Sequence, residues 1–142
     1  GGLNATNLAR MISEDSDVGT TRSFVKAVVA LDPFQPLGVE QNVPPNVERY
    51  VSFRHSQTPA NDCSQSAPLG PYRGIAPACT TSTDCSDYDF SAAPNESFPG
   101  GVTTNSYFGS QIGHCEVPDA AANAAVAALA GAPLPGPLPP LQ

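Results

Sequence analysis

The feature that most constrains this chain is the segment 24–38, which reads FVKAVVALDPFQPLG. Its first eight residues are apolar except for Lys26, and three of them are valines. A short apolar run ended by Asp-Pro is typical of a strand buried on both faces, and such strands occur mostly in parallel sheets covered by helices. Asp32 would stand at the carboxyl end of this strand, where open α/β sheets bind their ligands. The segment therefore predicts an α/β fold with a candidate site at Asp32, unless Asp32 only begins a turn.

The remaining patterns predict a helix before this strand and a strand, an irregular insert, a strand and a helix after it. Apolar spacing indicates an N-terminal helix, and an alanine-rich run that precedes Gly131 indicates a C-terminal one. The expected elements are a helix over 1–12, strands over 24–31, 47–53 and around 106–108, and a helix over 118–130. This order corresponds to the C-terminal half of an α/β sheet. We therefore expect a domain over 1–131, incomplete without an upstream segment or a partner chain, with a Pro/Ser/Thr-rich disulfide insert at about 54–101 and a Pro-rich tail over 132–142.

Composition indicates an extracellular protein. The net charge of −7 argues against nucleic acid and anionic membrane surfaces as partners, and no apolar run is long enough to span a membrane. Four cysteines and two glycosylation sequons, at Asn4 and Asn95, favour secretion.

The cysteine spacing lacks the C-x2-C pairs of zinc sites, and the acids at 84, 87 and 89 lack the glycine and glutamate of a calcium loop. We expect no metal and no cofactor.

Three pieces of the chain resemble the α/β-hydrolase superfamily in order and spacing. They are Gly1-Gly2 followed by a helix, the segment FVKAVVALDPFQPLG, and Gly113-His114-Cys115 before an alanine-rich helix. In that superfamily a G-x-S-x-G turn is followed by a helix and a strand of this kind. The most similar branch includes chlorophyllases, dienelactone-hydrolase-like proteins, polyester hydrolases and platelet-activating-factor acetylhydrolases. The insert has no counterpart in it.

The resemblance implies a Ser-Asp-His triad of which this chain carries two members. His114 would be the base, and Asp32 would be the acid that fixes its tautomer. Asp62 is the second choice for the acid, because polyester hydrolases place it after the next strand. The nucleophilic serine is not in this chain and would lie just upstream of Gly1. We expect the only other histidine, His55, at the surface or packed against the insert.

Four cysteines allow three disulfide pairings. Cys79 and Cys85 enclose only five residues, so we expect them to close a local loop. Cys63 and Cys115 then pair by exclusion. In the resembled fold this second bridge would hold the loop that carries His114.

These observations favour a secreted serine ester hydrolase whose acid and base lie in this C-terminal portion. The alternative is a non-catalytic extracellular structural or binding glycoprotein with a hydrolase-like fold, and a weaker one is a free-standing disulfide-rich module. The two main interpretations differ in whether a companion chain or upstream segment supplies the nucleophile.

Overall fold

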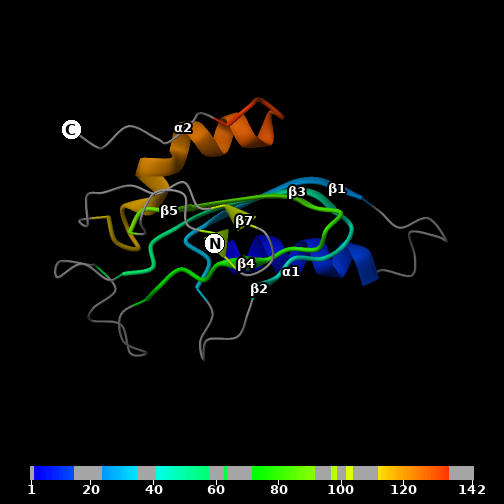
Figure 1. The fold of residues 1–142 in the computed structure, drawn as a ribbon, viewed down its shortest axis with the longest axis horizontal. Helices are drawn as coiled ribbons and strands as arrows, with labels where there is room; N and C mark the ends of the chain where they lie inside the picture. The colour runs from blue at the N-terminus through cyan, green and yellow to red at the C-terminus, as the bar shows by residue number, and fades with distance from the viewer. Residues whose placement is uncertain are drawn as a thin grey trace.

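The computed structural model describes residues 2–14, 24–34, 41–57, 63, 72–91, 97–98, 102–103 and 112–134. Its centre is a sheet of three parallel strands in the order β1-β3-β5. These strands are β1 (Val25–Leu31), β3 (Val47–Arg54) and β5 (Asp84–Asp89). The chain therefore has an α/β fold, in which two helices pack on the parallel strands (Figure 1).

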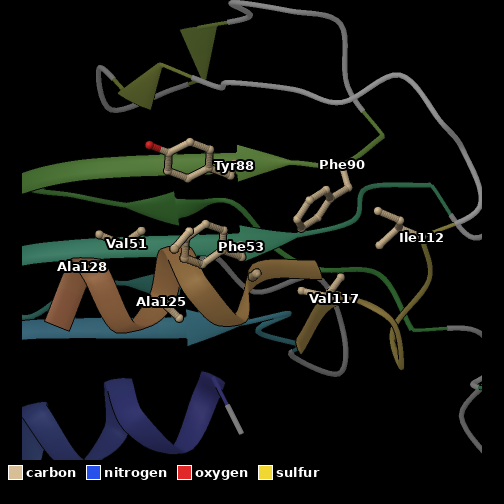
Figure 2. Close-up of a cluster of buried hydrophobic side chains, with 10 residues drawn as sticks. Val51, Phe53, Tyr88, Phe90, Ile112, Val117, Ala125 and Ala128 are labelled. Atoms are coloured by element: carbon tan, nitrogen blue, oxygen red, sulfur yellow. The ribbon is translucent and has the colours of Figure 1, made fainter. Parts of the chain in front are cut away.

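The two helices cover opposite faces of the sheet, with α2 (Val117–Leu129) above it and α1 (Gly2–Glu14) below it in Figure 1. On the α2 face, small alanines let the helix approach a layer of larger side chains that includes Val51, Phe53 and Tyr88 (Figure 2). The phenylalanine and tyrosine rings of this layer stack with their centroids 5.0 Å apart. This cluster is the larger of the two apolar cores.

Hydrogen bonds fix the direction of α1 beneath the sheet. The Thr6 hydroxyl lies 3.0 Å from that of Tyr50, in the middle of β3, and Asn46, just before β3, donates to the Ala9 carbonyl at 3.2 Å. The helix therefore runs antiparallel to the strands, and its N-terminal end lies toward their carboxyl edge. Burial raises the pKa of Tyr50 well above its usual value, so its hydroxyl stays protonated.

Short strands complete the described structure. β2 (Gln41–Asn42) pairs in parallel with β4 (Pro77–Ala78), and β6 (Ser97–Phe98) pairs in antiparallel with β7 (Val102–Thr103). The structure links Cys79 to Cys85 and Cys63 to Cys115, which is the pairing that the sequence predicts. None of the helices in the described part of the chain could cross a membrane.

Both helices and the first two strands of the sheet lie where the sequence predicts them, to within two residues. One expectation for β1 differs, because this strand is the edge of the described sheet. Val28 and Ala30, in the cluster with α1, are buried, whereas Val29 and Leu31, which pack against the α2 cluster, are only half-buried, so β1 is fully buried on one face and partly buried on the other.

The third strand of the sheet lies inside the predicted irregular insert. The segment DCSDYD forms β5, although it lacks the apolar pattern of a strand. Its carboxylates at Asp87 and Asp89 are buried against Arg54 of the neighbouring strand, so side chains typical of a loop stand in the interior. The strand predicted around 106–108 lies outside the described residues.

Candidate active site

Asp32 stands at the carboxyl end of β1 in an unusual backbone conformation. It has a φ of 43°, in the left-handed region that non-glycine residues seldom adopt, although aspartate tolerates it better than most. Its N–H donates to the carbonyl of Phe53 at 2.6 Å, which extends the pairing of β1 with β3 by one residue. Its side chain is almost fully buried. Backbone strain of this kind concentrates at functional sites.

His114 reaches the same carboxylate from a distant part of the sequence. It lies in the turn before α2, and its Nδ1 is 2.5 Å from Oδ2 of Asp32. Since an ionised carboxylate only accepts hydrogen bonds, Nδ1–H is the donor. About a third of the His114 side chain is exposed. The structure therefore brings together the acid and the base that the resemblance implies.

Two restraints hold the turn that carries His114. Cys115 is bonded to Cys63 with Cα atoms 6.1 Å apart, and the N–H of Gly113 donates to the Glu116 carboxylate at 3.0 Å. Both act on neighbours of the imidazole in sequence. A base that must stay aligned with its partners benefits from such restraints.

His55 binds the other oxygen of Asp32 and is not at the surface, which was one of its two expected places; the other, packing against the insert, agrees with its contact with Gly74. It directly follows β3 and is fully buried. Its Nδ1 lies 2.8 Å from Oδ1 of Asp32, and its backbone N–H donates to the same oxygen at 3.1 Å. The reason is the register of the parallel strands, in which Leu31 lies opposite Phe53, so that the residues following both strands meet.

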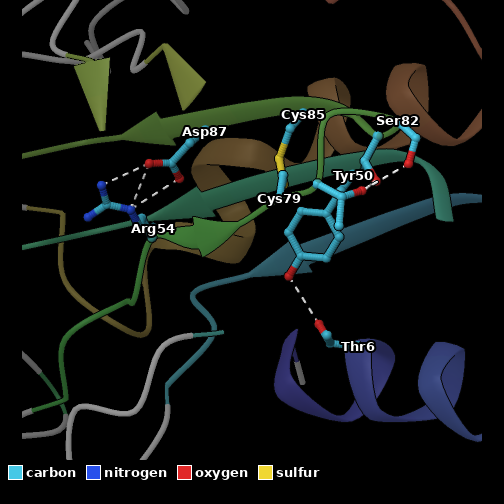
Figure 3. Close-up of a disulfide and its surroundings, with 9 residues drawn as sticks. Thr6, Tyr50, Arg54, Cys79, Ser82, Cys85 and Asp87 are labelled. Carbon is cyan, nitrogen blue, oxygen red and sulfur yellow. Dashed lines mark hydrogen bonds and ion pairs between the residues drawn. A yellow bond between two sulfur atoms is a disulfide. The ribbon is translucent and has the colours of Figure 1, made fainter. Parts of the chain in front are cut away.

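Arg54, next to His55, forms a buried ionic cluster with two carboxylates of β5. Its guanidinium donates to both oxygens of Asp87 at 2.8–3.1 Å (Figure 3). It also lies 2.7 Å from Oδ2 of Asp89. Burial raises the pKa of the Asp87 carboxyl, and the charge and hydrogen bonds of Arg54 oppose that shift. Oδ1 of Asp89 accepts from the backbone N–H of Ser56 at 3.1 Å. The cluster ties β3 to β5 directly beside the site.

The segment 72–76 passes across the carboxyl ends of β1 and β3. The N–H of Gly74 donates to the His55 carbonyl at 2.8 Å, and the N–H of Ile75 donates to the Pro33 carbonyl at 2.9 Å. A Cβ at Gly74 would lie 2.5 Å from Oδ1 of Asp32, so only glycine fits there. Nothing in the local pattern around Gly74 distinguishes it from the other glycines of the predicted insert.

Two aromatic rings stand beside the exposed part of His114. Tyr72 contacts the imidazole edge-on, with ring centroids 5.1 Å apart, and Phe34 packs on Tyr72 with centroids 4.2 Å apart. Both aromatic residues are half-buried. They form an apolar wall next to His114.

Other predicted site residues lie apart from this cluster or outside the described structure. Asp62 and Asn95 fall outside the described residues, so the second choice for the acid and one sequon stay predictions. Asn4 is exposed on α1, as a glycan acceptor must be. Within the residues that the structure describes, no group of three or more His, Cys, Asp or Glu side chains could hold a metal ion.

Compared with known proteins, the chain matches no family model, no curated protein sequence and no solved structure. The chemistry of the Asp32–His114 pair is the strongest indication of function. A buried carboxylate that binds Nδ1 of a partly exposed imidazole leaves Nε2 as the nitrogen for proton transfer, which is the arrangement of a general base.

Proposed function

We propose that this chain supplies the acid and the base of a secreted serine ester hydrolase, with the nucleophile on a segment that precedes Gly1 or on a companion chain. The observation that carries the proposal is the contact between Nδ1 of His114 and Oδ2 of Asp32. In the reaction, Nε2 of His114 takes the proton of a serine hydroxyl as its oxygen attacks the ester carbonyl, and then returns it to the leaving alcohol. Water repeats the sequence to release the acid. Asp32 stabilises the imidazolium throughout.

The direction of α1 supports a nucleophile located upstream. Because this helix runs antiparallel to the strands, its first residues lie toward the edge of the sheet where Asp32 and His114 meet. A strand-turn-helix unit ending in α1 would therefore present its turn residue at that edge. The resulting order of Ser, Asp and His along the chain is that of the α/β hydrolases.

The edge of β1 that has no partner strand among the described residues also favours a further segment beside this chain. A cavity of about 230 Å³ lies between α1, β1 and the end of α2, and its lining is apolar. Leu8, Phe24 and Leu129 are each more than half exposed. A parallel strand preceding α1 would cover these side chains and pair with the edge of β1, which in the described sheet bonds only to β3. Two disulfides are consistent with an oxidising compartment.

The test uses the protein expressed from its complete reading frame and purified from the medium. We expect a fluorophosphonate probe to label one serine and a short-chain p-nitrophenyl ester to be hydrolysed. Asp32→Asn should lower kcat by about 10⁴-fold, because the imidazole loses the partner that fixes its tautomer. Asp84→Asn, which changes an exposed carboxylate, is the matched control.

Asp62→Asn separates the two choices for the acid. If Asp32 is the acid, Asp62→Asn leaves kcat close to that of the wild type. The reverse ranking would move the acid to Asp62. A wild-type protein that neither reacts with the probe nor hydrolyses the ester would favour the non-catalytic glycoprotein instead.

A further inference from the structure

We propose that His55 is a positioning residue of this site: its Nδ1–H holds Oδ1 of Asp32 so that Oδ2 faces His114. The inference rests on the proposed function, which it extends by one residue. The triad that the resemblance implies needs a single histidine. The sequence analysis gave His55 no role in the site. In the structure, the two imidazoles divide the two oxygens of one carboxylate between them.

The hydrogen bonds around Asp32 leave the carboxylate one orientation. Oδ1 accepts from Nδ1 of His55 at 2.8 Å and from the backbone N–H of the same residue at 3.1 Å. Oδ2 lies 2.5 Å from Nδ1 of His114. Since the Asp32 side chain is 1% exposed, solvent cannot substitute for a lost donor. Rotation of the carboxylate would break the contacts with both rings at once.

The two imidazoles differ in their access to water, and this difference assigns their roles. The His55 side chain is fully buried, whereas 34% of the His114 side chain is exposed. A positive charge is costly to bury, so the charge that develops during proton transfer belongs on His114. His55 therefore acts as a neutral donor in its Nδ1–H tautomer. It orients Asp32 without competing for the transferred proton.

The surroundings of His55 hold it in place. Its carbonyl accepts from the N–H of Gly74 at 2.8 Å. Arg54 on one side binds Asp87, and the N–H of Ser56 on the other side binds Asp89. Arg54 and Ser56 therefore each bind a carboxylate of β5, and His55 between them binds Asp32 at the end of β1. A residue that positions another must itself be rigid, and His55 meets this condition.

The test compares two substitutions of His55 in the full-length protein. His55→Asn keeps an N–H donor close to the position of Nδ1, whereas His55→Phe keeps a ring and loses the donor. Val51→Ala is the control for stability, because Val51 is buried in the same strand but packs against α2. Two readouts are measured: kcat and KM on a short-chain ester, and the low-field proton resonance of Nδ1–H of His114 in ¹⁵N-labelled protein.

We expect His55→Phe to lower kcat about 10²-fold with little change in KM, because a misoriented carboxylate misplaces the base. The low-field resonance should disappear or move upfield in the same variant. His55→Asn should restore both readouts to near the wild-type values, and Val51→Ala should leave them unchanged. Equal losses in His55→Phe and Val51→Ala would show that His55 acts only through stability and would overturn the proposal.

The wild-type protein provides a further test that needs no variant. The ¹⁵N shifts of the His55 ring report its tautomer. An unprotonated Nδ1 would overturn the proposal. The resonance readouts also separate this inference from the proposed function. If the wild-type protein hydrolyses no ester but the His114 resonance responds to His55→Phe and not to Val51→Ala, positioning by His55 stands and the hydrolase assignment fails.

Discussion

At the residue scale, the candidate site depends on how Asp32 is confined. The carboxylate is buried, its backbone is in the left-handed region, and each oxygen has its own imidazole. Gly74 closes the remaining space beside Oδ1. These contacts join Asp32 to residues far from it in sequence. Substitutions around Asp32 should therefore lower activity by more than the accompanying loss of unfolding free energy would suggest.

The first prediction concerns the space at Gly74. In Gly74→Ala, the new Cβ would clash with Cβ of Arg54 and stand 2.5 Å from Oδ1 of Asp32. We expect a loss of about 1–3 kcal/mol in unfolding free energy, measured by urea denaturation, because backbone and neighbouring side chains must shift. Ester hydrolysis should fall as well. Gly131→Ala is the control: it is strained by a φ of 73° but meets open space, so it should cost stability without loss of activity.

The second prediction concerns the buried cation of Arg54. Arg54→Met leaves Asp87 and Asp89 buried without their guanidinium, and breaking such a pair typically costs about 3–5 kcal/mol. Removing Arg54 also removes what opposes the rise in the pKa of Asp87 caused by burial. A carboxyl whose pKa is raised by folding stabilises the folded state most at low pH, and this contribution is lost as pH rises through the folded-state pKa.

The variant should therefore lose more stability relative to the wild type at pH 8 than at pH 4, as urea denaturation at the two pH values would show. Lys26→Met, which removes an exposed partner of Glu48, should have little effect at either pH. A loss that is the same at both pH values would contradict this account of Asp87.

At the scale of elements, the two disulfides restrain different parts of the structure. Cys79–Cys85 closes a six-residue separation at the start of β5, whereas Cys63–Cys115 spans 52 residues and ends beside His114. The short bridge joins parts of one local loop. The long one restrains the turn between the insert and α2, which carries the candidate base.

The third prediction compares the two bridges through paired serine substitutions. Replacing Cys63 and Cys115 should lower the unfolding free energy by about 4 kcal/mol, and replacing Cys79 and Cys85 by about 2 kcal/mol, from loop-closure entropy. Only the first pair should also lower kcat sharply, because His114 loses its tether. Both quantities are measured on the same purified proteins, and equal kcat values for the two variants would show that the long bridge does not serve the site.

At the scale of the whole molecule, the large apolar side chains that are exposed in the described part of the chain lie on α1, on α2 and just before β1. Met11 is 66% exposed and Val126 is 68% exposed, and both lie on helices that border the β1 edge. An exposed sheet edge with apolar flanks promotes association. This surface supports the proposal that a further segment or chain packs beside the described sheet.

The fourth prediction is that residues 1–142 alone do not fold to a stable monomer. Expressed by themselves, they should elute as aggregates or melt without a cooperative transition, because the β1 edge stays uncovered. The same residues together with the proposed upstream segment or companion chain should melt cooperatively, and that protein is the control. A cooperative melt and a monomeric elution profile for 1–142 would contradict the prediction.

The resemblance to the α/β hydrolases, and no local pattern, paired Asp32 with His114. Local patterns in the sequence were enough to place α1, β1, β3 and α2. Each depends on neighbours in the chain: an apolar run ended by Asp-Pro, alternation over 47–53, and alanine spacing before Gly131. The cysteine spacing likewise predicted the two bridges. Hydrophobic periodicity and turn-forming residues extend over only a few positions. They therefore predict local structure without knowledge of the tertiary fold.

Only the tertiary structure determined which polar residues are buried in the interior and what they contact. Asp87 and Asp89 look like loop residues until Arg54, more than thirty positions away, pairs with them and makes β5 a buried strand. His55 and Gly74 likewise acquire their roles from Asp32, which reaches them through the register of neighbouring strands. A buried polar group is stable only with its partner in place. That partner is set by the packing of distant segments, which no local pattern encodes.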